Sequence, residues 1–100
     1  MEQRALAMFR ERVAALLGDN LSRIVLFGSR ARGEGHADSD LDLLVLVGNY
    51  DAQERKAVID IAADVDDQTG LRLMPVVMDA ARFAASFPLH DAVVREGVAL

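Results

Sequence analysis

Hydrophobic residues recur along this chain with two different spacings, and these predict helices and strands in alternation. Over residues 2–17 they return every three or four positions with charged residues between them, which is the pattern of an amphipathic helix. Gly18 is placed to end this helix. Residues 21–27 and 41–47 are instead nearly continuous in apolar character, as expected of strands that are covered on both faces.

The second half of the chain begins with another amphipathic pattern. A helix is predicted to start at Asp51, with Glu54 three residues on as in a capping box, and to end at Gly70. Residues 71–78 have the composition of a third strand. Pro75 removes one backbone donor from that strand, so we expect it at a sheet edge or a bulge.

The C-terminal part predicts two short helices, over residues 80–86 and 88–96. Asp79 and Ser86 have the short oxygen-bearing side chains that are typical of helix N-caps. The last three residues, 98–100, are expected to form a short tail.

This order of elements predicts an α/β domain with one small sheet of three or four strands, flanked by helices. Residues 28–40, between the first two strands, are too few for a full βαβ crossover, a unit of about 30 residues. A mixed sheet is therefore favoured over a doubly wound parallel one. The chain has 100 residues, and we expect residues 1–100 to form a single domain.

Composition narrows the chemistry that this domain can perform. The sequence holds no cysteine, which excludes thiolate catalysis and leaves oxygen ligands or the two histidines, His36 and His90, for any metal. A formal net charge of −5 argues against general binding to nucleic-acid backbones, although it is compatible with a small phosphate ligand bound through a cation. No long apolar run is present, so we expect neither a membrane span nor a signal peptide, and predict a cytoplasmic location.

The most chemically suggestive stretch lies between the first two strands. Asp40 and Asp42 stand two residues apart where the second strand begins, so their side chains point to the same face, about 6.5–7 Å apart along the chain. Such a pair repels unless a cation lies between its members, and Mg²⁺ prefers one or two carboxylates together with phosphate oxygens. An Asp pair that merely caps a strand is the alternative.

A glycine–serine turn follows the first strand directly. Gly28 lets the backbone bend sharply and approach a ligand closely, and Ser29 adds a hydroxyl group. Arg30 and Arg32 add permanent positive charge where free backbone N–H groups could face an anion. Together these residues could hold the outer phosphates of a nucleotide opposite a metal.

Residues 28–42 resemble the signature of the minimal nucleotidyltransferases (MNT) of the DNA polymerase β-like superfamily, which is Gly-Ser, ten residues, then Asp-x-Asp. Arg32-Gly33, Ser39 and the apolar run after Asp42 also match common usage in that family. The resemblance implies a polymerase β-like fold and transfer of a nucleoside monophosphate, usually AMP from ATP, to an acceptor hydroxyl group.

The resemblance also assigns roles. Gly28 and Ser29 would bind the triphosphate, and Asp40 and Asp42 would hold two Mg²⁺ ions and act as the catalytic residues. Many minimal members are antitoxins that pair with a HEPN-domain ribonuclease toxin, and some inactivate the toxin by adding AMP to a tyrosine. The expected partners are thus a nucleoside triphosphate and either a HEPN-type toxin or a second copy of the chain.

The chain departs from the family pattern at one point. Members of the superfamily normally carry a third carboxylate on a neighbouring strand, and the aligned position here is expected to be Pro75, which ligates nothing. Asp79 lies further along the same strand, and a helix cap is its favoured role. The alternative to an active transferase is therefore a catalytically impaired antitoxin or interaction protein of the same fold.

Overall fold

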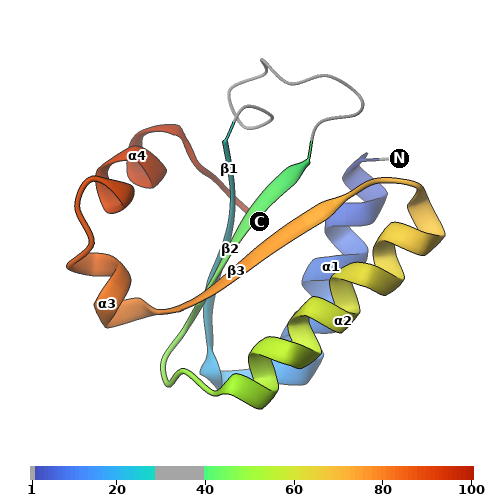
Figure 1. Ribbon diagram of the computed structural model, residues 1–100, viewed down its shortest axis with the longest axis horizontal. Coiled ribbons are helices and arrows are strands. Elements are labelled where there is room, and N and C mark those ends of the chain that lie inside the picture. The colour runs from blue at the N-terminus through green and yellow to red at the C-terminus, as the bar shows by residue number, and fades with distance from the viewer. Residues whose placement is uncertain (1, 29–39) are drawn as a thin grey trace.

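The helices and strands predicted from the hydrophobic pattern all form in the computed structural model, which describes residues 2–28 and 40–100 (Figure 1). The last residues add a strand that the sequence pattern does not predict. In chain order the elements are α1 (Glu2–Leu17), η1 (Gly18–Asn20), β1 (Leu21–Phe27), β2 (Leu41–Val47), α2 (Ala52–Thr69), β3 (Leu73–Asp79), α3 (Ala80–Ala84), α4 (Leu89–Glu96) and β4 (Val98–Ala99).

The strands form one mixed sheet in the order β3-β2-β1-β4. β1 pairs antiparallel with β2 and with β4, whereas β2 and β3 run parallel. This confirms the predicted α/β class and the mixed sheet. The expected C-terminal tail is wrong, because Val98 and Ala99 pair with Leu26 and Val25. Pro75 lies in an edge strand, as predicted. No strand lies on the outer side of β3, so no hydrogen bond to a neighbouring strand is lost there.

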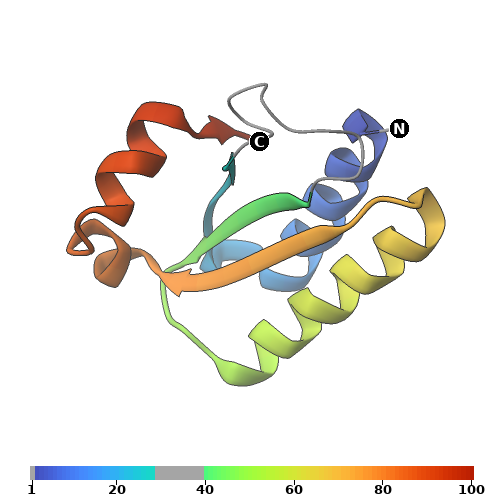
Figure 2. The same ribbon diagram turned by 45° about the horizontal axis from the view of Figure 1, so that its top comes forward.

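One face of the sheet is covered along its length by α1 and α2, which lie together on the same side (Figures 1 and 2). Burial of these side chains removes apolar surface from water and supplies the main favourable term in folding. The core on this face consists of Ala5, Phe9, Val13, Leu17, Ile24, Leu26, Leu41, Leu43, Val45, Val47, Val58, Ala62, Val65 and Leu73.

The opposite face is covered by α3 and α4 and has a smaller core. Phe83 and Val93 from these helices pack on Val25, Leu44 and Leu46 of the sheet. α3 follows β3 directly and packs against β2 and β3, whereas α4 packs against β1 (Figure 2). The open half of this face is the part at the start of β2 and β3, where Asp42 is half-buried and Met74 is exposed.

Helix ends follow the predicted capping chemistry with two corrections. Asp51 accepts hydrogen bonds from the backbone N–H groups of Gln53 and Glu54, at 2.8 and 3.1 Å. The expected return bond of a capping box is absent from the described contacts, since the Glu54 carboxylate accepts from Asn20 at 2.8 Å. Gly70 ends α2 at φ +75°, as predicted.

The predicted N-cap role of Ser86 is wrong. Its hydroxyl group donates to the backbone carbonyl of Arg82 at 2.7 Å, which ties it to the end of α3. The residue at the N-cap of α4 is Pro88, with no side-chain hydrogen bond to the helix.

Among residues 2–28 and 40–100, the helices are all too short or too polar to cross a membrane.

Candidate functional site

The turn after β1 brings a glycine backbone against a carboxylate. Gly28 has φ +85°, in the left-handed region that favours glycine, which confirms the predicted sharp bend. A Cβ atom added at Gly28 would overlap Oδ2 of Asp42, because Asp42 is paired with the preceding residue, Phe27. The missing side chain at Gly28 therefore makes room for the Asp42 carboxylate.

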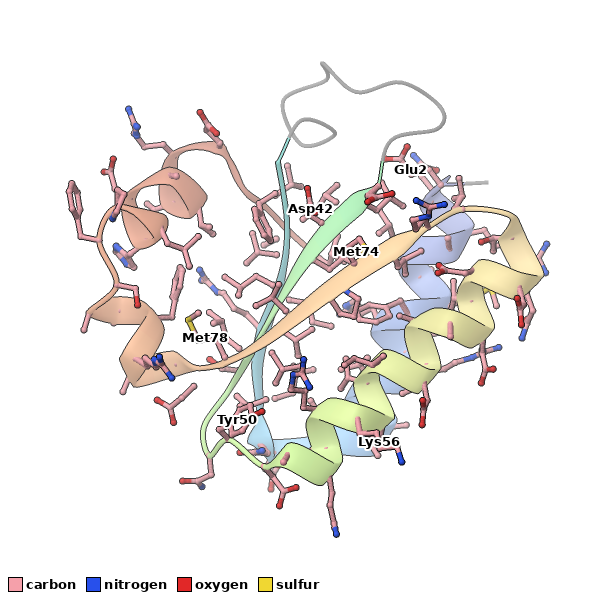
Figure 3. The ribbon with its side chains drawn as sticks, viewed as in Figure 1. Glu2, Asp42, Tyr50, Lys56, Met74 and Met78 are labelled. Carbon is pink, nitrogen blue, oxygen red and sulfur yellow. The ribbon has the colours of Figure 1, made fainter. Side chains whose placement is uncertain are left out.

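Asp40 and Asp42 lie at the start of β2, on the open half of the sheet. Asp42 shares its face with Leu44 and Leu46, which α3 and α4 cover, but itself lies beyond the covered part and is half-buried. Figure 3 shows Asp42 near one end of β2 and Tyr50 beyond the other end. The sheet thus presents the Asp pair and the Gly28 turn together.

The negative charge of Asp40 acts on the Asp42 carboxylate. Partial burial raises the pKa of Asp42 above its ordinary value, and the negative charge of Asp40 raises the same pKa further. A desolvated carboxylate next to a like charge is stabilised when a cation arrives. This pair therefore has the electrostatic character of a cation site.

Sequence reasoning missed a cation that lies beside the pair. Nη1 of Arg72, just before β3, lies 3.7 Å from Oδ1 of Asp40. The backbone carbonyl of Arg72 also accepts a hydrogen bond from Leu41 at 2.8 Å. Only the parallel register of β2 and β3 could have revealed this contact, since Leu41 is paired with Leu73 and the residues before them are then neighbours.

The expected alignment of Pro75 with a third carboxylate is wrong. In the parallel register Pro75 is paired with Leu43, whose side chain points into the core beneath α1 and α2. The residue paired with Asp42 is Met74, which shares its face and is 47% exposed. Figure 3 shows Asp42 and Met74 on adjacent strands at the same end of the sheet. The non-ligating neighbour of the Asp pair is thus Met74.

Asp79 is a helix cap, as predicted. Its carboxylate accepts from the backbone N–H groups of Ala81 and Arg82, at 2.9 and 3.1 Å. It is paired with Val47 at the far end of β2 from Asp42 and shares the face of Pro75, so it cannot join the Asp pair.

The Asp40 and Asp42 carboxylates are oxygen donors of the kind that Mg²⁺ prefers. Within the parts of the chain that the structure describes, no His, Asp or Glu joins Asp40 and Asp42 in a cluster of three. Two carboxylates are what Mg²⁺ takes from a protein when substrate phosphates complete its oxygen shell. Ser29, Arg30 and Arg32, the other predicted phosphate-binding residues, lie outside the described residues.

Comparison with known sequences identifies relatives over most of the chain. Residues 6–95 match the family described as "Nucleotidyltransferase domain". MJ0141 of Methanocaldococcus jannaschii, whose name marks it as an inferred protein adenylyltransferase, is 33% identical over 70 residues, which cover 69% of this chain and 71% of that protein.

Comparison with solved structures finds nucleotidyltransferase chains and antitoxin chains of similar fold. One described as an inferred minimal nucleotidyltransferase has a TM-score of 0.61 and 31% identity, covering 97% of this chain and 94% of that one. A chain of a toxin–antitoxin crystal structure with AMP-PNP has a TM-score of 0.59 and 30% identity, covering 89% and 69%. A chain from the complex of a tri-AMPylated Shewanella oneidensis HEPN toxin with an MNT antitoxin has a TM-score of 0.50 and 25% identity, covering 93% and 69%.

Proposed function

Because this chain belongs to the nucleotidyltransferase domain family, we propose that it transfers AMP from ATP to a hydroxyl group of an acceptor protein. The observation that carries the proposal is the Asp40–Asp42 pair on the uncovered half of the sheet, next to the Gly28 turn. A relative inferred to be a protein adenylyltransferase supports AMP as the transferred group and a protein as the acceptor.

The proposed roles follow from the chemistry of each side chain. Asp40 and Asp42 would hold Mg²⁺, which when bound neutralises charge on the triphosphate. Gly28 would let the backbone approach the phosphates, and Ser29 would bind them through its hydroxyl group. Arg30 and Arg32 would add positive charge on the same side, an assignment that rests on the sequence motif.

The reaction would join the acceptor oxygen to the α-phosphorus of ATP. The bond from that phosphorus to the oxygen bridging to the β-phosphate would break, pyrophosphate would leave, and the hydroxyl proton would be released. Transfer of this kind depends mainly on positioning and on neutralising charge, so it needs no covalent nucleophile from the protein. That agrees with a chain that holds no cysteine and has an Asp pair as its most chemically distinctive group.

We propose that the acceptor is a HEPN-type toxin for which this chain acts as antitoxin. The support comes from two relatives of known structure, one a toxin–antitoxin pair with AMP-PNP and the other a complex with an AMPylated HEPN toxin. Addition of AMP to a toxin hydroxyl group would place bulk and negative charge on the toxin, which is a direct way to block a ribonuclease site.

A transfer assay tests this function. The chain is incubated with Mg²⁺, the product of the neighbouring reading frame and ATP labelled at the α-phosphate, with γ-labelled ATP as the control for phosphorylation. Label from α-labelled ATP should join the partner, and Asp40→Asn/Asp42→Asn should abolish this. Asp60→Asn/Asp64→Asn, which neutralises two exposed carboxylates on α2, should leave transfer intact. Transfer that persists without Asp40 and Asp42 would refute the assignment.

A second candidate function is inhibition of a partner by binding alone. It is favoured by Met74, which stands beside Asp42 where a further carboxylate would complete the site. The two functions separate in cells that express the toxin. Under the transfer proposal, Asp40→Asn/Asp42→Asn loses protection. Under binding alone, the same variant still protects and still co-purifies with the toxin.

A further inference from the structure

Arg72 is attached to the start of β2 at two points. Its backbone carbonyl accepts from the N–H of Leu41 at 2.8 Å, which fixes the main chain. Its guanidinium Nη1 lies 3.7 Å from Oδ1 of Asp40. The side chain of Arg72 is 73% exposed, whereas that of Asp40 is 38% exposed, so the guanidinium can leave this contact without disturbing the core.

The segment that carries Arg72 is held from its other side by α2. Asp66 accepts a hydrogen bond from the N–H of Leu73 at 2.8 Å, immediately after Arg72. The peptide group that joins Arg72 to Leu73 is therefore held at both its C=O and its N–H, while the side chain of Arg72 extends into solvent beside the Asp pair. In this arrangement the backbone of Arg72 stays in place while its guanidinium group can exchange one anionic partner for another.

Binding of a divalent cation and a triphosphate at the proposed site would change the net charge that Arg72 faces beside Asp40. With no divalent cation present, Arg72 offsets part of the negative charge of Asp40, with which it is paired. A divalent cation between the carboxylates would neutralise them and would repel the guanidinium. A triphosphate would then bring negative charge beside Arg72, and guanidinium groups pair well with phosphate oxygens.

We infer that Arg72 couples the two ligands of the site: its guanidinium pairs with Asp40 in the free protein and with a phosphate group when cation and triphosphate bind together. This inference deepens the proposed function and rests on it, since it requires Asp40 and Asp42 to be the cation ligands. Arg72 is a positioning residue in this scheme. It disfavours the cation alone and favours the cation with a nucleoside triphosphate.

The expected effects are modest and opposite in sign. Exposed ion pairs are worth little, so Arg72→Ala should tighten binding of Mn²⁺ alone by about two- to fivefold. The same substitution should weaken binding of Mn²⁺ with a non-hydrolysable ATP analogue by at least about the same factor, because a phosphate partner is lost. A purely structural role would move both affinities in the same direction.

The experiment is a titration of the whole chain with Mn²⁺, followed by electron paramagnetic resonance of the free ion, with and without the ATP analogue. Arg72→Lys keeps the charge and should retain most of the coupling. Arg95→Ala is the matched control, since Arg95 is 70% exposed and pairs at 3.2 Å with Asp91 on α4, in the helical part that covers the other half of the sheet. It should change neither affinity. Circular dichroism melts check that each variant is folded.

The outcomes separate this inference from the proposed function. Opposite shifts in Arg72→Ala, both absent in Arg95→Ala, support the coupling. Mn²⁺ binding that is lost in Asp40→Asn/Asp42→Asn but unchanged in Arg72→Ala overturns the role of Arg72 and leaves the proposed site standing. Wild-type Mn²⁺ binding that ignores Asp40→Asn/Asp42→Asn overturns both.

Discussion

The two faces of the sheet differ in how completely helices cover them. On one face, α1 and α2 pack along β1, β2 and β3, and Phe9, Val13, Leu43, Val45 and Val58 are inaccessible to solvent. On the other, α3 and α4 cover the half near Leu44 and Leu46, while Asp42 and Met74 at the start of the strands stay partly exposed (Figures 2 and 3). β2 contributes side chains to both faces, Leu43 and Val45 to one and Asp42, Leu44 and Leu46 to the other.

This difference separates the part of the sheet that stabilises the fold from the part that carries the candidate site. The face covered by α1 and α2 supplies most of the buried apolar surface. Packing on that face alone can therefore hold β2 in place. The half-covered face can then leave two carboxylates partly exposed at the start of β2. Substitutions on the two faces should accordingly have different consequences.

The largest effect on stability should come from the covered face. Phe9→Ala removes a fully buried ring and should lower the free energy of unfolding by about 3–5 kcal/mol. Met74→Ala on the open half should cost less than about 1 kcal/mol, because that side chain is 47% exposed. Urea denaturation followed by circular dichroism measures both. Equal losses would mean that the open half is part of the core.

The turn glycine should matter for activity more than for folding. Gly28→Ala imposes a left-handed conformation on alanine, at about 1–2 kcal/mol, and its methyl group would push the Asp42 carboxylate aside. Displacement of a positioned group by about 1 Å can cost about 100-fold in rate, and we expect a loss of transfer of that order.

Gly70→Ala is the matched control for this prediction. Gly70 also has a positive φ, +75°, but a Cβ atom there meets nothing within 4 Å. It should show a similar loss of stability with transfer retained. Loss of transfer in both variants would trace the effect to general destabilisation instead of to Asp42.

The register of β2 and β3 can be tested by adding a carboxylate. Met74→Asp places one beside Asp42 on the same face, and should tighten Mn²⁺ binding by about tenfold because ligand charge sets the affinity of such sites. Pro75→Asp, one residue on, points to the opposite face beside α2 and should give no gain. A gain from Pro75→Asp alone would contradict the register.

The smallest effect concerns the stability of the free protein. Burial and Asp40 raise the pKa of Asp42, so the folded state binds a proton more readily than the unfolded state and loses stability as the pH rises through that raised value. Asp42→Asn should therefore be slightly more stable than wild type at pH 7. The gain should vanish below the ordinary aspartate pKa of 3.8. Thermal melts across this pH range, with the exposed Asp60→Asn as control, measure it.

Local patterns in the sequence were sufficient for most of the fold. Helical periodicity predicted the main helices, and apolar runs and composition predicted the first three strands. The glycines and aspartates at the ends of these elements indicated most boundaries, as at Asp51 and Gly70. β4 escaped prediction because a strand of two residues has no periodicity and exists only through pairing with β1. Ser86 has the right chemistry for a cap, but the carbonyl of Arg82 is its partner.

The features of the candidate site that lie close together in the sequence were predictable. Those that depend on the register between strands were not. Gly28 and the Asp pair were found from their spacing, and the contact between Gly28 and Asp42 follows from β1–β2 pairing. Which residue of β3 stands beside Asp42 depends on a parallel alignment with α2 between the strands, and the sequence pattern did not fix it. Arg72 was missed for the same reason.

The most direct test of the account is a crystal structure of the chain with Mn²⁺ and a non-hydrolysable ATP analogue, in which anomalous scattering locates the metal. We predict manganese bound by carboxylate oxygens of both Asp40 and Asp42, with the phosphates on the side of Gly28. Manganese bound elsewhere, with Asp40 still paired to Arg72, would contradict the central claim that this half of the sheet is a nucleotidyltransferase site.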